Sequence, residues 1–150
     1  MCDMTKLNLG CGFRKKTGYV NIDNRKVCKP DLMCDISEGL PFGSNSVVEV
    51  WAHDFLEHIV SDKVIFVMRE IWRVLEPGGI LDHFTPSTDG RGAFQDPTHR
   101  SFWNINSWLY YQDDAYRQLI QTPVKFAGIN KDIETGLGVI HTIGRLTAVK

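Results

Sequence analysis

Apolar residues are spread along the chain in short runs, and one segment has the period of a helix. Between positions 61 and 75 they recur at i, i+3, i+4 and i+7, which predicts a helix with one buried face. Pro77-Gly78-Gly79 favours an end to this helix. The other early runs are shorter and predict strands. These predicted strands are Lys6–Leu9, Tyr19–Ile22, Asp31–Cys34, Val47–Ala52 and Ile80–Thr85.

The C-terminal part contains helical and strand-like segments in turn. Residues 104–120 predict one or two short helices, and Asp96-Pro97 has the residue types of a helix N-cap and a first helical position. Val124–Ile133 and Val139–Val149 predict two strands, joined by residues 134–138 in an antiparallel hairpin. Strands that alternate with crossovers predict an α/β fold. We expect a Rossmann-like open sheet of about seven strands, mainly parallel, with the last strand antiparallel.

Two of the predicted crossovers are too short for a full helix. Only Phe13–Gly18 lies between the first two strands, and the second and third are separated by about seven residues, too few for a helical crossover. One sheet face near the first strand is therefore expected to have little cover. An uncovered face favours a partner chain, most simply in a homodimer.

The length of 150 residues, with 43% hydrophobic and 23% charged residues, is typical of one globular domain over residues 1–150. A net charge of −1 gives no support for non-specific nucleic-acid or membrane binding. No apolar run approaches the roughly 20 residues of a membrane helix, and the N-terminus has no signal-peptide core. The cysteines form no C-x-x-C pair. We expect a cytoplasmic protein with reduced thiols.

Glycines and acidic residues stand at the ends of the predicted strands, where ligands bind in an open α/β sheet. Gly10 and Gly12 allow a tight turn close to a ligand, and backbone N–H groups in such a loop can hold an anion. Asp23, at the end of the second strand, is placed to accept hydrogen bonds from ribose hydroxyls. Asp35, at the end of the third, can accept one from the exocyclic amine of adenine. Each residue alone is also consistent with an ordinary turn, but their order predicts an adenosine site.

The same loop limits the choice of nucleotide. The dinucleotide fingerprint G-x-G-x-x-G requires glycine at position 15, where this chain has Lys15. The phosphate-binding pattern G-x-x-x-x-G-K-S/T is absent too. These observations argue against a nicotinamide cofactor and against a nucleoside triphosphate.

The glycine loop is the first of seven segments that occur in a set order along the chain. They are Leu7–Gly12, Gly18–Asp23, Cys34–Ile36, Leu40–Phe42, Phe55–His58, Arg69–Leu81 and Asp96–Arg100. In this order and spacing, over roughly residues 6–108, the chain resembles the class I S-adenosylmethionine-dependent methyltransferases. It is most similar to the short, type-11-like domains with a compressed first half. The order of the segments is more specific than any one of them.

The resemblance implies that S-adenosylmethionine is the cofactor and gives a role to each site residue. By position, the implied residues are Asn8, Gly10, Cys11 and Gly12 for the methionyl part, Asp23 and Asn24 for the ribose, Asp35 and Ile36 for the adenine, and His53, Asp54 and Phe55 for closure near the sulfonium. Asn8 departs from the family, which often has an acid there, and this weakens the expected contact to the methionyl amine.

Two histidines are candidates for the catalytic base that an oxygen or nitrogen acceptor needs. His58 lies one short turn beyond the fourth predicted strand, and an ordinary first-turn helical residue is the alternative interpretation. The spacing Asp54-x-x-Glu57-His58 is also similar to the E-x-x-E-H pattern that some methyltransferases use for a divalent metal. Because side chains in a first helical turn are more often structural, we predict no metal.

His99 follows the fifth predicted strand, where the family builds its acceptor pocket. Together with Arg100, Trp103 and Trp108 it has two interpretations. The four residues form either an aromatic, partly basic pocket wall or part of a packed helix with a buried aromatic face.

The sequence thus predicts methyl transfer from S-adenosylmethionine. A small-molecule or saccharide-like acceptor is expected, because the chain has no nucleic-acid-binding module and no basic tail. The alternative is a non-catalytic scaffold that binds S-adenosylmethionine or adenosine, which Asn8, the missing helices and the short chain favour. A nicotinamide oxidoreductase is a third option that Lys15 opposes. No nucleic-acid or membrane partner is expected.

Overall fold

The computed structural model describes residues 4–150, which form one eight-stranded sheet in the order β3-β2-β1-β4-β5-β8-β6, with β7 also paired to β8. The parallel strands are β1 (Thr5–Leu9), β2 (Val20–Asp23), β3 (Leu32–Met33), β4 (Val47–His53) and β5 (Leu75–Pro86). The antiparallel strands are β6 (Phe126–Ala127), β7 (Asn130–Gly136) and β8 (Val139–Ala148). The predicted open, mainly parallel α/β sheet is confirmed.

Three α-helices and five 3-10 segments join these strands. The α-helices are α1 (Val64–Val74), α2 (Gly92–Gln95) and α3 (Asp114–Leu119). The 3-10 segments are η1 (Lys26–Cys28), η2 (Ile36–Glu38), η3 (Leu56–His58), η4 (Ser61–Lys63) and η5 (Ile105–Tyr111). The helix predicted over residues 61–75 is η4 followed by α1, and the helical segment predicted over residues 104–120 is η5 followed by α3.

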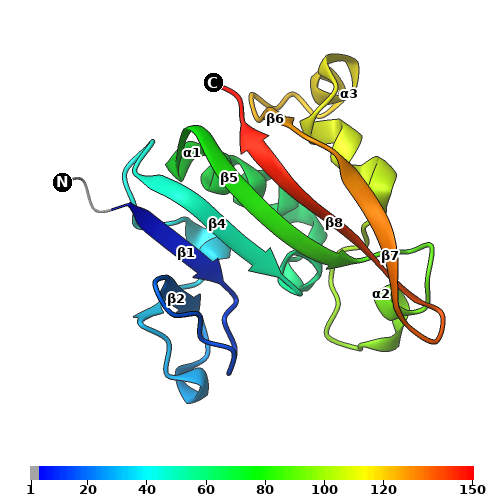
Figure 1. The fold of residues 1–150 in the computed structure, drawn as a ribbon, viewed down its shortest axis with the longest axis horizontal. Coiled ribbons are helices and arrows are strands. Elements are labelled where there is room, and N and C mark those ends of the chain that lie inside the picture. Colours follow the sequence, from blue (N-terminus) through cyan, green and yellow to red (C-terminus); the bar gives the residue numbers. More distant parts are fainter. Residues whose placement is uncertain (1–3) are drawn as a thin grey trace.

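The crossovers near β1 are as short as predicted. A loop joins β1 to β2, and the connection from β2 to β3 contains only η1. Among residues 4–150, α1 is the only α-helix that connects two parallel strands. Figure 1 shows the strands in front of α1, with no helix in front of β1, β4, β5 and β8.

Two predictions about local structure were wrong. The strand predicted over Val124–Ile133 is divided into β6 and β7, because Gly128 has φ +138°, and a Cβ there would lie 3.0 Å from the Arg145 carbonyl oxygen. Asp96 does not begin a helix, since α2 has already ended at Gln95. Its carboxylate instead accepts hydrogen bonds from the Thr98 N–H and hydroxyl, at 2.8 and 2.6 Å, within a turn.

The core lies on the α1 side of the sheet. Successive strand residues point to opposite faces, so every second residue of the central strands enters this core. Its fully buried members include Leu7, Leu9, Val50, Ala52, Leu81 and Leu146 of the strands and Val67, Met68, Ile71 and Val74 of α1.

The opposite face carries stacked rings and charged groups. The His53 ring stacks on Trp51 and Phe84, with centroids 3.6 and 5.4 Å apart. Arg145 pairs with Glu49 and with Asp82. This face therefore presents polar chemistry where the other presents apolar packing. No helix among the described residues has the length and apolar character that a membrane crossing requires.

Candidate cofactor and active site

The loop after β1 depends on two glycines in the left-handed region, with φ +60° at Gly10 and +50° at Gly12. A Cβ on Gly10 would lie 2.5 Å from Cδ2 of Phe55. Glycine therefore serves two purposes at position 10, the positive φ and the close approach of the Phe55 ring. The Cys11 N–H donates to the Ile22 carbonyl at 2.9 Å, which ties the loop to β2.

Asn8 is buried and supports the connection from β1 to β2 through its side-chain amide. Its amide donates to the Asn21 side chain at 2.9 Å and to the Arg14 carbonyl at 3.1 Å, and the residue is 5% exposed. An acid could not make these bonds, because a carboxylate only accepts. The departure from the family at this position therefore has a structural reason in the short connection from β1 to β2.

Asp23, at the end of β2, is a buried carboxylate with a full set of donors. It accepts from the Gly12 N–H at 2.9 Å, from the Arg25 N–H at 2.9 Å, and from the Arg25 guanidinium at 3.1 and 3.3 Å. Burial raises the pKa of Asp23, but the hydrogen bonds from Arg25 and Gly12 outweigh it and leave the pKa below its ordinary value. This residue is therefore an ionised acceptor that faces the glycine loop.

Asp35 and Ile36 lie where β3 passes into η2. The Asp35 Oδ1 accepts from the Ser37 N–H at 3.0 Å and from its hydroxyl at 2.6 Å, so Asp35 caps the 3-10 turn. Ile36 follows it and is 4% exposed. The pair thus combines an exposed carboxylate with an apolar surface.

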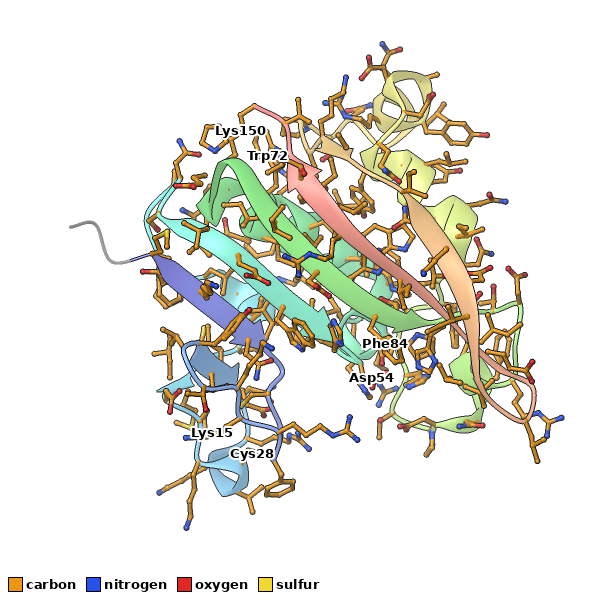
Figure 2. The ribbon with its side chains drawn as sticks, in the orientation of Figure 1. Lys15, Cys28, Asp54, Trp72, Phe84 and Lys150 are labelled. Atoms are coloured by element: carbon orange, nitrogen blue, oxygen red, sulfur yellow. The ribbon has the colours of Figure 1, made fainter. Side chains whose placement is uncertain are left out.

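The end of β4 brings three predicted residues to the same edge. Asp54 has φ +49°, and its N–H donates to the Phe84 carbonyl at 2.8 Å. Figure 2 shows Asp54 and Phe84 close together at the ends of β4 and β5. His53 points to the open sheet face, where its Nε2 lies 2.6 Å from Asp82.

Beyond Phe55, η3 places Glu57 and His58 beside the segment that contains His99. Two N–H groups, of Arg100 and Ser101, donate to the Glu57 carbonyl at 2.7 and 3.0 Å and hold the segments together. The His58 and His99 rings meet edge to face, with centroids 5.1 Å apart. Burial raises the pKa of Glu57 to about 8.

Two adjoining cavities, of about 340 and 550 Å³, lie along this edge of the sheet and share Gly10, Arg25 and Asp54. Both volumes fall within the range of small-molecule sites. The predicted residues that line the first are Gly10, Asp23, Asn24, Asp35, Ile36, Asp54, Phe55 and His58. Those that line the second are Asn8, Gly10, Cys11, Gly12, His53 and Asp54.

The predicted residues around His99 do not line either of these two cavities. Trp103 and Trp108 are 3% and 0% exposed and belong to the core, so the packed interpretation holds for them. His99 itself does not line either cavity but lies behind His58.

Sequence reasoning missed several lining residues, chiefly Arg25 and Thr98. Arg25 bonds to Asp23 from two positions away, and no sequence pattern marks it. Thr98 had a signal, because Asp-x-Thr is typical of a turn in which the acid accepts from the following N–H. Lys15 and Lys16 also line the second cavity. Lys15 pairs with Asp31 at 2.8 Å, and Lys16 lies 3.9 Å from the Trp51 ring centroid.

A profile of the methyltransferase domain family matches residues 14–81. An S-adenosylmethionine-dependent methyltransferase from Archaeoglobus fulgidus has the same fold, with a TM-score of 0.68 and 12% identity over 96% of this chain and 85% of that one. The family match and the shared fold make this chain similar to the class I S-adenosylmethionine-dependent methyltransferases.

Two further solved structures share the fold of this chain. The Burkholderia thailandensis 1,6-didemethyltoxoflavin-N1-methyltransferase, solved with 1,6-didemethyltoxoflavin and S-adenosylhomocysteine, has a TM-score of 0.64 and 14% identity, and covers 97% of this chain and 71% of that one. The (4+2)-cyclase SpnF has a TM-score of 0.71 and 15% identity, and covers 97% and 74%. At these identities the likeness concerns the fold. No curated protein matches the sequence.

The cofactor implied by the family is S-adenosylmethionine, and the residues present fit its parts. Carboxylates at Asp23 and Asp35 suit ribose hydroxyls and an adenine amine, and the buried Ile36 suits an adenine face. Arg14 and Lys15, beside the second cavity, suit a carboxylate. One adjustment is required for a ribose to bind at Asp23. The Arg25 guanidinium donates hydrogen bonds to the Asp23 carboxylate, and these bonds have to be replaced by bonds from the ribose hydroxyls. The Arg25 side chain is 60% exposed and is free to turn outward.

Proposed function

We propose that this protein transfers a methyl group from S-adenosylmethionine to an oxygen or nitrogen of a small-molecule or saccharide-like acceptor. The observation that carries the proposal is the first cavity, which extends from Asp23 and Asp35 to His58 and Thr98. It joins an adenosine-type end to an end with an imidazole and a hydroxyl. A non-catalytic scaffold has no need of the second end.

Most of the work assigned to this chain is orientation. S-adenosylmethionine supplies a methyl group that is already activated on a positively charged sulfur. Gly10 and Phe55, packed against each other, set the shape of the cavity between its two ends. A rigid wall there restricts the relative positions of donor and acceptor, which contributes to the rate of a displacement.

His58 and His99 are assigned to the acceptor end. The Nδ1 atom of His58 lies 3.3 Å from the Thr98 carbonyl, which fixes the ring while its Nε2 is free to accept a proton. His99, with a side chain 6% exposed, supports the His58 ring from behind. We therefore assign the base to His58 and a positioning role to His99.

Calorimetry with S-adenosylmethionine and S-adenosylhomocysteine tests the first half of the proposal, and failure of both to bind at millimolar concentration would overturn it. A screen for S-adenosylhomocysteine release across acceptor classes tests the second half. We expect His58→Ala to keep cofactor affinity and to lose about 10²- to 10⁴-fold in turnover. Lys131→Ala, an exposed change on β7, is the control. Cofactor binding without turnover on any acceptor would favour the scaffold instead.

We also propose that the open sheet face is covered by a second copy of the chain. Its charges are of both signs, with Lys6 and Arg145 beside Glu49 and Asp82, so that two copies related by a twofold axis can pair opposite charges. Light scattering at two salt concentrations tests this. A monomer at low salt would remove the proposal without affecting the methyltransferase site.

A further inference from the structure

We propose that Glu57, His58 and His99 form a binding site for a divalent transition-metal ion of the Zn²⁺ class, at the acceptor end of the first cavity. The prediction of no metal took no account of His99, which comes from a segment about forty residues further along the chain. The inference deepens the proposed function, on which it rests for the role of the metal but not for its binding.

The three side chains converge on one point. One ligand atom from each lies within 4.8 Å of those of the other two. The His58 Nε2 lies 3.9 Å from the Glu57 Oε1. A tetrahedral ion at about 2.1 Å from each ligand spaces the ligand atoms about 3.4 Å apart. Side-chain movements of about an ångström therefore close the site.

Both imidazoles are already in the tautomer that a metal requires. The His99 Nδ1 lies 2.8 Å from the Ala93 carbonyl, and the His58 Nδ1 lies 3.3 Å from the Thr98 carbonyl. A carbonyl can only accept, so the hydrogen of each ring is on Nδ1 and the lone pair is on Nε2. A hydrogen bond from the remaining ring N–H to a backbone carbonyl is the usual support of a metal-binding histidine.

An independent observation points to a missing partner at the same place. Glu57 is 2% exposed, and its Oε2 has no hydrogen-bond partner among the described residues. A buried polar atom without a partner is costly, and such atoms are rare in folded proteins. A cation between Glu57 and the two histidines supplies that partner.

The ligand types select the kind of ion. Two imidazoles and one carboxylate suit Zn²⁺ and similar transition metals, whereas Mg²⁺ prefers oxygen ligands. Three protein ligands leave a position open to a substrate atom. With the ion bound, the His58 Nε2 is a ligand and no longer the base. Because His58 lines the cavity, we infer that an acceptor hydroxyl takes the open position, that its pKa falls on binding to the metal, and that its proton is released to water. Asp96, with Oδ2 at 3.7 Å from the His99 Nε2, has a side chain 44% exposed and stays outside this set.

Titration of the metal-free protein with Co²⁺, followed by visible absorption and by Zn²⁺ competition, tests the site. We expect binding in the micromolar range or tighter, no competition from millimolar Mg²⁺, and an absorption spectrum typical of nitrogen ligation. Glu57→Gln and His99→Gln should each weaken Co²⁺ binding by about 100-fold or more. Glu76→Gln, which removes an exposed carboxylate elsewhere, should leave it unchanged.

Thermal unfolding of each variant without metal shows whether it folds, so that a lost site is distinguished from a lost fold. Failure of the folded protein to bind Co²⁺ at millimolar concentration would overturn the inference, as would unchanged binding in both variants or equal competition by Mg²⁺. Cofactor calorimetry on the same samples separates the two proposals. Retained S-adenosylmethionine binding without metal binding removes the metal site alone.

Discussion

Asp23 lines one end of the first cavity, and Glu57 is buried beside His58 at the other end; these two carboxyl groups are in opposite states. Asp23 accepts four hydrogen bonds from Gly12 and Arg25, and these hold its pKa below the ordinary value. Glu57 has one oxygen without a partner, and burial raises its pKa to about 8. A carboxylate with its donors in place is a fixed, charged acceptor. A buried carboxyl group without donors is either protonated or requires a cation beside it.

The origin of the partners explains this difference. The donors to Asp23 come from the adjoining loop and from two residues further along the chain. The groups beside Glu57 belong to His58 and to the distant segment that carries His99. One end of the cavity is thus completed by local chain geometry, and the other is left for a ligand to complete.

The largest effect is expected for the pH dependence of stability in Glu57→Gln, measured by urea unfolding with a chelator present. The pKa of Glu57 rises from 4.5 in the unfolded chain to about 8 in the folded protein. The folded protein holds the proton of the Glu57 carboxyl group more tightly than the unfolded chain does. The resulting stabilisation is fully present below pH 4.5 and is lost as the pH rises to about 8. The uncharged variant lacks this loss, so it should gain roughly 3–5 kcal/mol relative to wild type between pH 4.5 and pH 8.5.

Glu76→Gln is the matched control, because it makes the same change at an exposed position. A constant difference between wild type and Glu57→Gln across this pH range would show that Glu57 is solvated or paired in solution. Glu57 would then not be a buried carboxyl group without partners, and it would no longer differ from Asp23 in this respect.

The second effect concerns cofactor affinity in Asp23→Asn. An amide in place of a charged acceptor costs about 2–3 kcal/mol per ligand contact, which is roughly 30- to 100-fold in the dissociation constant of S-adenosylmethionine. Asp35→Asn should cost less than about tenfold, because Asp35 is exposed and its contacts are screened by solvent. Calorimetry on both variants measures this. Equal losses would show that burial of Asp23 adds nothing to recognition.

The cofactor end could be predicted from sequence because its chemistry follows strand ends. Once the strand order is known, Gly10, Asp23 and Asp35 must lie along one edge of the sheet. The details could not be predicted. The support that Asn8 gives to the neighbouring loop depends on its hydrogen bond to the Asn21 amide. The pairing of Arg25 with Asp23 depends on the side-chain rotamer of Arg25.

At the acceptor end, sequence spacing was a weaker guide. The first-turn position of His58 was visible, but the packing that brings His99 to it depends on N–H groups that donate to the Glu57 carbonyl. No periodicity contains that information, because backbone hydrogen bonds between loops leave no residue pattern. Gly128 is a similar case, since a glycine with positive φ divides a run of residues that otherwise has strand character.

The smallest effect is expected for Arg25→Met, which removes the guanidinium that now occupies Asp23. Because the Arg25 side chain is 60% exposed, the lost ion pair should cost less than about 1 kcal/mol of stability. Its removal leaves Asp23 with fewer donors and opens the carboxylate to ribose hydroxyls, so cofactor affinity should rise by about two- to fivefold. Lys26→Met, an exposed change one residue away, controls for the loss of a positive charge. A tenfold fall in affinity for Arg25→Met alone would show that the guanidinium holds the cofactor itself, and that Asp23 positions Arg25 instead of binding the ribose.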